Sequence, residues 1–370
     1  MWYSTEIIRR IIEDLIHSID AHAVKYHPLH GKEDVDLSDD IGLSSMQLME
    51  LAAKANAFFQ LFAAENPPYL LSGTKLSSWI QKIQNSCTNQ LKNIGFASSG
   101  TGGQIRLHVH PLNLLLEETS FLKTLFPVPD RVISLVASHH IFGFLFTVLL
   151  PWQWKIPCLV WGEDGVSDLD LTSLIIATPF HWQYLYDSYN GQDRTLTGVS
   201  SGGPLDPILY KKMLQKGWRI MDVYGSTETG GIGFRSNPDE LFQLFPHWQW
   251  VHDESGSVML KHSTHGFCIG MMDNILLSHG SKFELAGRKD GAVQIAGVNV
   301  YPANIAEKIR DIRGVTDCYL FAKAVSGVTK LFCNIYLEPD TRETQSFCIE
   351  QMRLLLSSVE YPADINFFHS

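Results

Sequence analysis

The sequence lacks the features that mark membrane and secreted proteins. Its longest apolar run, residues 141–152, is shorter than the roughly 20 residues of a membrane-spanning helix and contains Pro151. The first residues, MWYSTEIIRRIIED, carry charges where a signal peptide would be apolar. The six cysteines are scattered with no CxxC pair, which is typical of buried thiols in a reducing compartment rather than of a disulfide or metal framework. We therefore expect no membrane span and a cytoplasmic protein.

An excess of positive charge is also absent. The formal net charge is −10, which argues against a nucleic-acid partner, because proteins that bind nucleic acids usually carry a stripe of basic residues. Internal repeats and low-complexity tracts are missing as well. What remains is an ordinary globular composition, with 45% apolar and 18% charged residues in a chain of 370. That length allows two or three domains with a sizeable core.

The stretch VYGSTETGG, at residues 223–231, combines the residue types that a nucleotide needs. Tyr224 offers a flat face for a purine, and Gly225 lets the backbone come close to a ligand. The hydroxyl of Thr227 can contact phosphate oxygens, and Glu228 offers a hard oxygen ligand for Mg²⁺. Taken alone, the stretch is equally typical of a turn rich in small polar residues.

A second candidate phosphate site lies in IGFASSGTGGQIRLHVH, at residues 94–110. Glycines let backbone N–H groups converge on an anion, and hydroxyl side chains add donors. A flexible linker could have the same composition, and the Gly-Lys-Ser/Thr ending of a Walker loop is absent. The candidate residues are Ser98, Ser99, Gly100, Thr101, Gly102 and Gly103, followed by the cation of Arg106.

Between residues 132 and 225, apolar β-branched runs alternate with helix-length stretches. This pattern predicts a mostly parallel sheet covered by helices, whose ligand sites gather at the carboxyl ends of the strands. Three loops are placed there: residues 138–143 with His140, residues 201–205 with Gly202 and Gly203, and the loop of Tyr224. A lone histidine is more often structural, but the aromatic neighbours of His140 favour a site role.

These motifs, in this order, resemble those of the adenylate-forming superfamily of acyl-CoA synthetases, adenylation domains and luciferases. YGSTE is similar to its central signature, SSGTGG to its TSGTTG phosphate loop, SHHIFG to its acyl-gate segment and SGGPL to its GGAPL loop. The resemblance implies ATP and Mg²⁺ as cofactors, adenine near Tyr224 and the Gly202–Gly203 loop, and catalytic roles for Thr227, Glu228, Arg106 and His140. Arginine replaces the family's lysine at Arg106 and keeps the cation.

Asp273, followed fourteen residues later by Gly287 and Arg288, resembles the family's ribose-binding block. Asp273 can accept both ribose hydroxyls while Arg288 donates to the same sugar. Without the resemblance, the block would be a hairpin followed by a capped helix. The departures are Met271 and Met272 before the aspartate and Gln294 in place of a later lysine. Asp290 stands at the family's hinge between domains.

Residues 1–90 have the periodicity of a small helical bundle, with Ser4 as a helix cap. GLSSMQLMEL, ahead of a second helix, resembles acyl carrier proteins, in which the serine corresponding to Ser45 receives 4′-phosphopantetheine. Serine replaces the family's aspartate at Ser44. The alternative is a plain bundle in which Ser44 or Ser45 is an N-cap. The apolar residues expected to line the second helix are Met46, Leu48, Met49, Leu51, Ala52, Ala55 and Phe58.

The expected fold is therefore α/β and α+β multidomain: a small N-terminal helical bundle, a mostly parallel α/β core and a small C-terminal α+β domain. The predicted boundaries are 1–90 for the carrier-like domain, 94–289 for the adenylate-forming core and 290–370 for the C-terminal domain, with a short polar linker near residues 85–93. The family's catalytic-lysine tail is absent by Ser370. We expect adenylate formation to be slow for that reason.

The resemblance implies an acid–thiol ligase that activates an aryl or fatty acid and transfers it to a phosphopantetheine thiol, for polyketide or aryl-polyene starter loading. The expected partners are the acid, the chain's own or a separate acyl carrier protein, and a phosphopantetheinyl transferase. Two alternatives are an ordinary acyl-CoA ligase and a non-catalytic carrier or scaffold with a degenerate ATP-binding domain. The missing lysine favours the scaffold, whereas Glu228, Asp273 and Arg288 oppose it.

Overall fold

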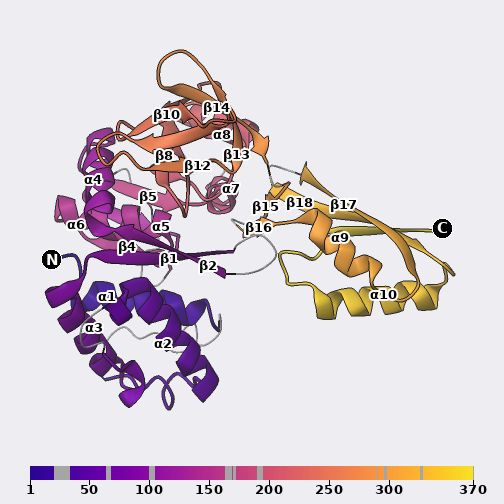
Figure 1. Cartoon of the computed structure of the whole chain (residues 1–370), viewed down its shortest axis with the longest axis horizontal. Helices are drawn as coiled ribbons and strands as arrows, with labels where there is room; N and C mark the ends of the chain where they lie inside the picture. The colour runs from indigo at the N-terminus through magenta and orange to yellow at the C-terminus, as the bar shows by residue number, and fades with distance from the viewer. Residues whose placement is uncertain are drawn as a thin grey trace.

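The computed structural model describes residues 1–20, 34–63, 68–99, 105–162, 169, 172–189, 195–289, 291–295, 298–325 and 328–369. Helices of the N-terminal stretch lie on one side of a large mixed sheet, and a small α+β unit lies at the other end of the long axis (Figure 1). The predicted fold class is confirmed. In the described part of the chain, no helix is both long and apolar enough to cross a membrane.

Three helices form the N-terminal bundle: α1 (Thr5–His17), α2 (Ser45–Phe59) and α3 (Leu76–Gln90). The Ser4 hydroxyl accepts a hydrogen bond from the Ile7 amide at 3.4 Å, so the predicted cap of α1 is confirmed. Short 3₁₀ turns at Leu61–Ala63 and Leu70–Ser72 follow α2. In α3, residues 85–90 continue the helix, so a linker over these residues is wrong. Asn85 and Thr88 are exposed on this helix, whereas Cys87 is buried.

The capping box of α2 explains which of its faces is buried. The Ser44 hydroxyl accepts from the Gln47 amide, and the Gln47 side chain accepts from the Ser44 amide, which starts the helix at Ser45. In this register Met46 and Met49 are 77% and 54% exposed, so they do not line the bundle as predicted. The buried residues of the helix are Leu48, Leu51, Ala52, Ala55, Asn56, Phe58 and Phe59.

The large sheet has nine strands in the order β13-β14-β9-β8-β7-β6-β5-β3-β4. Strands β3 to β7 are parallel, as predicted, and the remaining four continue the sheet antiparallel. Every residue of β5 is buried, as expected for a strand with both faces covered. The strands are β3 (Arg131–Ser134), β4 (Cys158–Val160), β5 (Ser173–Ala177), β6 (Thr197–Ser200), β7 (Arg219–Ser226), β8 (Gly230–Arg235), β9 (Phe242–Leu244), β13 (Asp273–Leu277) and β14 (Lys282–Arg288).

Helix α4 (Leu112–Leu122) precedes β3, α7 (Pro179–Ser188) connects β5 to β6, and α8 (Pro207–Gln215) connects β6 to β7. Pro207 occupies the first turn of α8, and the Asp206 carboxylate accepts from two amides of that turn, which fixes where the helix begins. A 3₁₀ turn at Lys123–Leu125 follows α4. The apolar run at 141–152 forms α5 (Ile141–Gly143), a π-helix at Phe144–Leu149 and α6 (Leu150–Trp154), and all six π-helix residues are buried.

Two smaller sheets flank the large one. The hairpin of β1 (Asn93–Ser99) and β2 (Ile105–Pro111) places Ser98 opposite Arg106. The three-stranded sheet contains β10 (Trp248–His252), β11 (Val258–His262) and β12 (Cys268–Gly270). Cys268 is exposed, so the expectation of buried thiols is wrong at this position; it is right for Cys87 and for the three cysteines of the C-terminal unit.

The C-terminal unit follows the predicted order of strand, helix, strand, strand, helix and strand. After the hairpin of β15 (Val293–Ile295) and β16 (Val298–Val300), helices α9 (Pro302–Arg310) and α10 (Arg342–Leu355) cover the sheet. That sheet consists of β17 (Val315–Val325), β18 (Val328–Leu337) and β19 (Asp364–His369), with β19 parallel to β18. Its buried residues form a hydrophobic core of their own.

Candidate functional site

The loop between β7 and β8 carries the central motif and is held close to its own backbone. A side chain at Gly225 would place its first carbon 2.3 Å from the carbonyl oxygen of Gly230, so only glycine fits this crossing. The Thr229 hydroxyl lies 3.0 Å from that of Ser226 and also accepts from the Ser226 amide. Both contacts leave Thr227 and Glu228 at the tip of a fixed turn.

Two histidines of β2 dock onto this tip. The ring N–H of His110 donates to the carbonyl oxygen of Thr227, with Nε2 at 2.7 Å. Nε2 of His108 lies 3.0 Å from the Ser98 hydroxyl and 3.5 Å from Oε1 of Glu228. The predicted phosphate segment and the predicted metal ligand are thereby linked through one imidazole. Burial lowers the pKa of His110, which keeps its ring neutral near pH 7.

Tyr224, Asp273 and Arg288 come together at the edge of the sheet. The Tyr224 hydroxyl donates to Oδ2 of Asp273 at 2.5 Å, and Asp273 faces Arg288 directly across β13 and β14. Burial, together with the neighbouring carboxylate, raises the pKa of Tyr224, so its hydroxyl stays protonated and able to donate. Phe242 and Phe283 pack around the tyrosine ring, with centroids 5.9 Å away in both cases. The result is an aromatic platform beside a carboxylate and a guanidinium.

A buried carboxyl group from α4 supports the far end of the loop. Oε1 of Glu118 accepts from the Gly231 amide at 2.8 Å, and the indole N–H of Trp248 donates to the Gly231 carbonyl at 2.9 Å. A first side-chain carbon at Gly230 would lie 2.5 Å from Oε2 of Glu118. Burial raises the pKa of Glu118 to about 8, so at neutral pH this carboxyl is mostly protonated.

Glu228 is suited to hold a divalent cation together with a ligand. Its side chain is 40% exposed at the loop tip, and Mg²⁺ is typically bound through one or two carboxylates plus phosphate oxygens. Among the residues that the structure describes, there is no cluster of three or more histidine, cysteine, aspartate or glutamate side chains that could hold an ion unaided. The donor set therefore fits a metal that arrives with a nucleotide.

His140 lies away from the loop tip, close to Asp14 of α1. Burial of its ring lowers the pKa of His140, and the carboxylate of Asp14 opposes that effect. The rings of His139 and His140 have centroids 4.2 Å apart. Arg106 is exposed on β2, on the same hairpin as Ser98 and Ser99. His140 thus lies near Asp14 of α1, whereas Thr227 and Glu228 lie against β2, and a site role for His140 stays a prediction.

The loop after β6 meets the start of the C-terminal unit. Gly202 has a φ of +80°, which favours glycine, and a side chain at Gly203 would approach Oε1 of Gln294 to 3.6 Å. Ser45 is exposed at the first turn of α2, which lies on the opposite side of the β1–β2 hairpin from β13 and β14 (Figure 1). Gly100, Thr101, Gly102, Gly103 and Asp290 lie outside the described residues.

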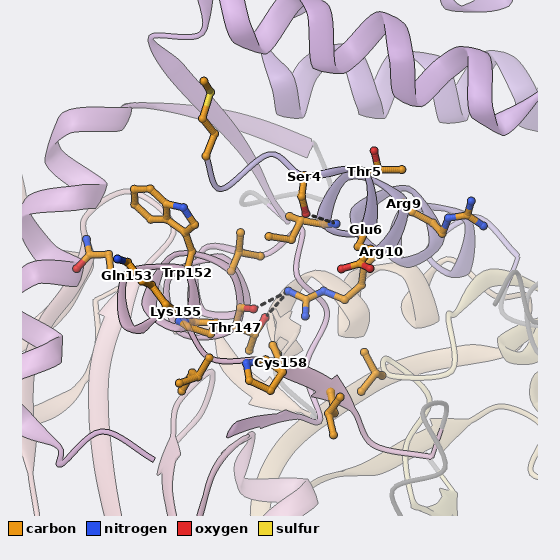
Figure 2. Close-up of a pocket in the computed structure, with 18 of the residues that line it drawn as sticks. Ser4, Thr5, Glu6, Arg9, Arg10, Thr147, Trp152, Gln153, Lys155 and Cys158 are labelled. Carbon is orange, nitrogen blue, oxygen red and sulfur yellow. Dashed lines mark hydrogen bonds between the residues drawn. The ribbon is translucent and has the colours of Figure 1, made fainter. Parts of the chain in front are cut away.

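A cleft of about 1350 Å³ lies between α1, α6 and β4, away from every predicted site residue (Figure 2). Cationic side chains of Arg9, Arg10, Lys123 and Lys155 line it, with acidic Glu6 and Glu13. Figure 2 shows Arg10 turned toward Thr147 rather than into open space.

Sequence reasoning missed His108, His110, Glu118 and Asp14. The alternation of His108 and His110 places both on one face of a strand and could have marked a docking surface. Glu118 belongs to the acidic pair EE on a helix, and Asp14 to the polar face of an amphipathic helix. Such positions are usually solvated, so only the packed fold identifies them.

The chain is similar in sequence to known ligases. No family model matches the chain. It is 29% identical over 290 residues to a 4-coumarate–CoA ligase of Halorhodospira halophila, covering 76% of this chain and 72% of the relative. A 4-coumarate–CoA ligase of Cereibacter sphaeroides is also 29% identical, over 73% of this chain and 66% of its own length.

In fold, the chain resembles the amide bond synthetase of Marinactinospora thermotolerans, with a TM-score of 0.59 and 14% identity. The match covers 75% of this chain and 66% of that one. An NRPS protein containing adenylation and PCP domains matches with a TM-score of 0.55 and 15% identity, over 75% and 66% of the two chains. In sequence the chain is thus similar to 4-coumarate–CoA ligases, and its motifs resemble those of the adenylate-forming superfamily.

Proposed function

We propose that this chain activates an aryl or fatty carboxylic acid with ATP and transfers the acyl group to a phosphopantetheine thiol. The observation that carries the proposal is the joining of Tyr224, Asp273 and Arg288 beside the loop of Glu228. Together they offer an aromatic face, an acceptor for two vicinal hydroxyls, a cation and a metal ligand, which is the recognition set of a nucleoside triphosphate.

The first step forms an acyl adenylate. A carboxylate oxygen of the acid attacks the α-phosphorus of ATP, and the bond to the bridging oxygen breaks to release pyrophosphate. The protein contributes position and charge stabilisation. The hydroxyl of Thr227 and the cation of Arg106 would contact the phosphates, and Glu228 would hold Mg²⁺, which would offset part of their charge. His108 and His110 keep that turn in place.

The second step transfers the acyl group to a thiol. A thiolate sulfur attacks the acyl carbon, the carbon–oxygen bond to the phosphate breaks, and AMP leaves. Exposed Ser45 at the start of α2 is the candidate attachment point for 4′-phosphopantetheine in the same chain. A helix N-terminus favours the resulting phosphodiester, and attachment in cis would give the thiol a high effective concentration. A separate carrier protein could supply the same group, in a starter-loading pathway of the polyketide or aryl-polyene type.

An acyl-CoA ligase is the second candidate, favoured by the name of the relatives, 4-coumarate–CoA ligase. That name also favours an aryl acid. The two candidates share the first step and differ only in the thiol, so they are separated at the second.

Pyrophosphate exchange with ATP, run with 4-coumarate and with a series of saturated fatty acids, tests the first step. Incubation with CoA and a broad-specificity phosphopantetheinyl transferase, followed by intact-mass measurement of wild type and Ser45→Ala, tests the carrier role. We expect acid-dependent exchange, and a pantetheine adduct on wild type alone. Exchange without an adduct, together with acyl transfer to free CoA, would favour the CoA ligase. No exchange with any acid would favour the non-catalytic alternative.

A further inference from the structure

Helix α1 holds both ends of the segment that carries His140. At its start, Oδ2 of Asp14 accepts from the Ser138 amide at 2.7 Å and also accepts a short hydrogen bond from the Ser138 hydroxyl. Ser138 is 1% exposed, so its amide has no ready access to water. A buried amide without a partner is costly, and Asp14 removes that cost.

At the other end, Arg10 caps the π-helix. Its guanidinium Nη2 donates to the Thr147 carbonyl oxygen at 2.6 Å and lies 3.3 Å from the Thr147 hydroxyl (Figure 2). The Thr147 hydroxyl in turn donates to the Gly143 carbonyl at 2.7 Å. The π-helix is a rare form of helix, and such turns occur often at functional sites. Arg10 thus stabilises a helical form that is otherwise rare.

The two contacts come from one face of one helix. Arg10 and Asp14 are four residues apart, so their side chains project on the same side of α1 and span residues 138–147 together. Aromatic packing also holds the segment against the N-terminal bundle, because the rings of Trp2 and Phe58 contact Phe144 edge-on, with ring centroids 5.0 and 5.6 Å away. The backbone at Gly143 lies close to that of Ala137, because a side-chain carbon at Gly143 would lie 2.0 Å from the Ala137 carbonyl oxygen.

We propose that α1 is part of the acid-binding half of the site, with Asp14 and Arg10 as positioning residues that set the place of His140 and Phe142. The inference rests on the proposed function and deepens it. Neither residue touches the reacting atoms. They fix the wall that an acyl group would meet, and so determine which ring size or chain length is accepted.

A helix that only packs would not need these two charges. Burial disfavours the charged form of Asp14 and raises its pKa, and the Ser138 hydrogen bonds and Arg10 offset part of that effect. Apolar residues at both positions would fill the same volume without that cost. The charges are explained if the segment between them must keep one backbone geometry.

The test uses Asp14→Asn, Asp14→Ala and Arg10→Met in the full chain, with Asp34→Asn as the matched control. Asp34 is an exposed carboxylate of the same N-terminal stretch that pairs with Lys75 and Ser77, away from residues 138–147. The measurements are kcat and KM for 4-coumarate, a C10 fatty acid and ATP, together with the melting temperature of each variant.

We expect Asp14→Ala and Arg10→Met to raise KM for the better acid by about tenfold and to change the ratio of kcat/KM between the two acids by a similar factor. Asp14→Asn, which keeps an acceptor, should recover most of the loss. KM for ATP should stay within twofold in all variants, and Asp34→Asn should match wild type. The inference would be overturned if KM for ATP rose as much as KM for the acid. It would also be overturned if the ratio of kcat/KM between the two acids stayed unchanged. A wild-type chain that is inactive on every acid would overturn the proposed function and the inference with it.

Discussion

The two ends of the chain relate to the large sheet in opposite ways. Residues of α1, α2 and α3 share one continuous hydrophobic core with β1, the π-helix and the large sheet, in which Phe58 meets both Phe96 and Phe144 edge-on. The C-terminal unit instead encloses a separate core between α9, α10 and its own three strands. A change of sequence pattern along the chain therefore need not coincide with a boundary between hydrophobic cores. The boundary predicted near residue 90 remains a prediction, and apolar packing is continuous across it.

The largest effect should come from pH, because Glu118 lies in the shared core. Its pKa rises from 4.5 in the unfolded chain to about 8 in the fold, so the native state binds the extra proton between these values. The free energy of unfolding of the shared core should therefore fall as pH rises from 4.5 to 8, and level off above 8. His139 and His247, with pKa values lowered to about 3 and about 4, act in the opposite direction below pH 6.5.

The informative window is thus pH 6.5 to 8.5. Urea denaturation of wild type and Glu118→Gln across it should show a falling stability in wild type and a flatter profile in the variant. Glutamine keeps an acceptor for the Gly231 amide and cannot ionise. An equal slope in both proteins would contradict the prediction. The C-terminal unit, followed by hydrogen exchange, should be unaffected by the substitution.

Truncation of Phe58 should destabilise two regions at once. Phe58 is 3% exposed and contacts the rings of Phe59, Phe96 and Phe144, so Phe58→Ala should cost about 3–5 kcal/mol of unfolding free energy. Hydrogen exchange should rise in α1 to α3 and in the large sheet together. A loss confined to residues 1–90 would mean that the N-terminal helices form an independent folding unit.

Met352→Ala makes the matching change in the other core. Met352 is fully buried between α10 and the C-terminal sheet, and its truncation should cost that unit about 2–5 kcal/mol. Exchange protection should fall in residues 298–325 and 328–369 while the large sheet keeps its own. ATP affinity, measured by calorimetry, should change little, because Tyr224, Asp273 and Arg288 belong to the large sheet. Simultaneous loss of protection everywhere would argue for one cooperative unit.

Asp273→Ala should leave both cores intact and weaken ATP binding by about tenfold to a hundredfold, since a charged acceptor of two hydroxyls is removed. Asp239→Ala, which removes an exposed carboxylate paired with Lys211 at 2.7 Å, is the control and should bind ATP like wild type. Equal affinities of the two variants would place the ribose elsewhere.

The smallest effect is expected at the surface of the C-terminal unit. Lys308 and Glu360 form an ion pair at 3.0 Å with both side chains partly exposed. Solvent screening limits such pairs, so Lys308→Ala should lower the stability of this unit by less than about 1 kcal/mol. Differential scanning calorimetry at low and high salt should show a shift that disappears in salt. A larger, salt-independent loss would indicate that the aliphatic stem of Lys308 packs against the unit.

The sequence predicts the strand and helix order well wherever the signal is local. The parallel strands β3 to β7 and the whole C-terminal unit follow from apolar runs of strand length and from helical periodicity. The resemblance led us to expect Asp273 and Arg288 at one sugar, and the two residues are neighbours across β13 and β14. The buried face of α2 was predicted less well, because Met46 and Met49 are apolar and yet exposed.

What could not be predicted depends on tertiary docking. His110 becomes a site residue only because its hairpin lies against the loop of Thr227, and Asp14 only because α1 lies against Ser138. In both cases the chain positions are more than a hundred residues apart, and neither partner has a local signal for the other. Hydrophobic periodicity indicates which face of a helix or strand is buried, but it does not indicate which other element packs against that face.

The one exposed thiol has a practical consequence. Of the six cysteines, four are buried, Cys158 is partly covered and Cys268 is exposed on β12. A maleimide dye should therefore react first at Cys268, without removal of any native cysteine. A second dye on an unnatural amino acid at an exposed position of α10, such as Leu354, would complete an energy-transfer pair. That pair would report in real time whether α10 moves relative to the three-stranded sheet that contains β12 as ATP and acid are added.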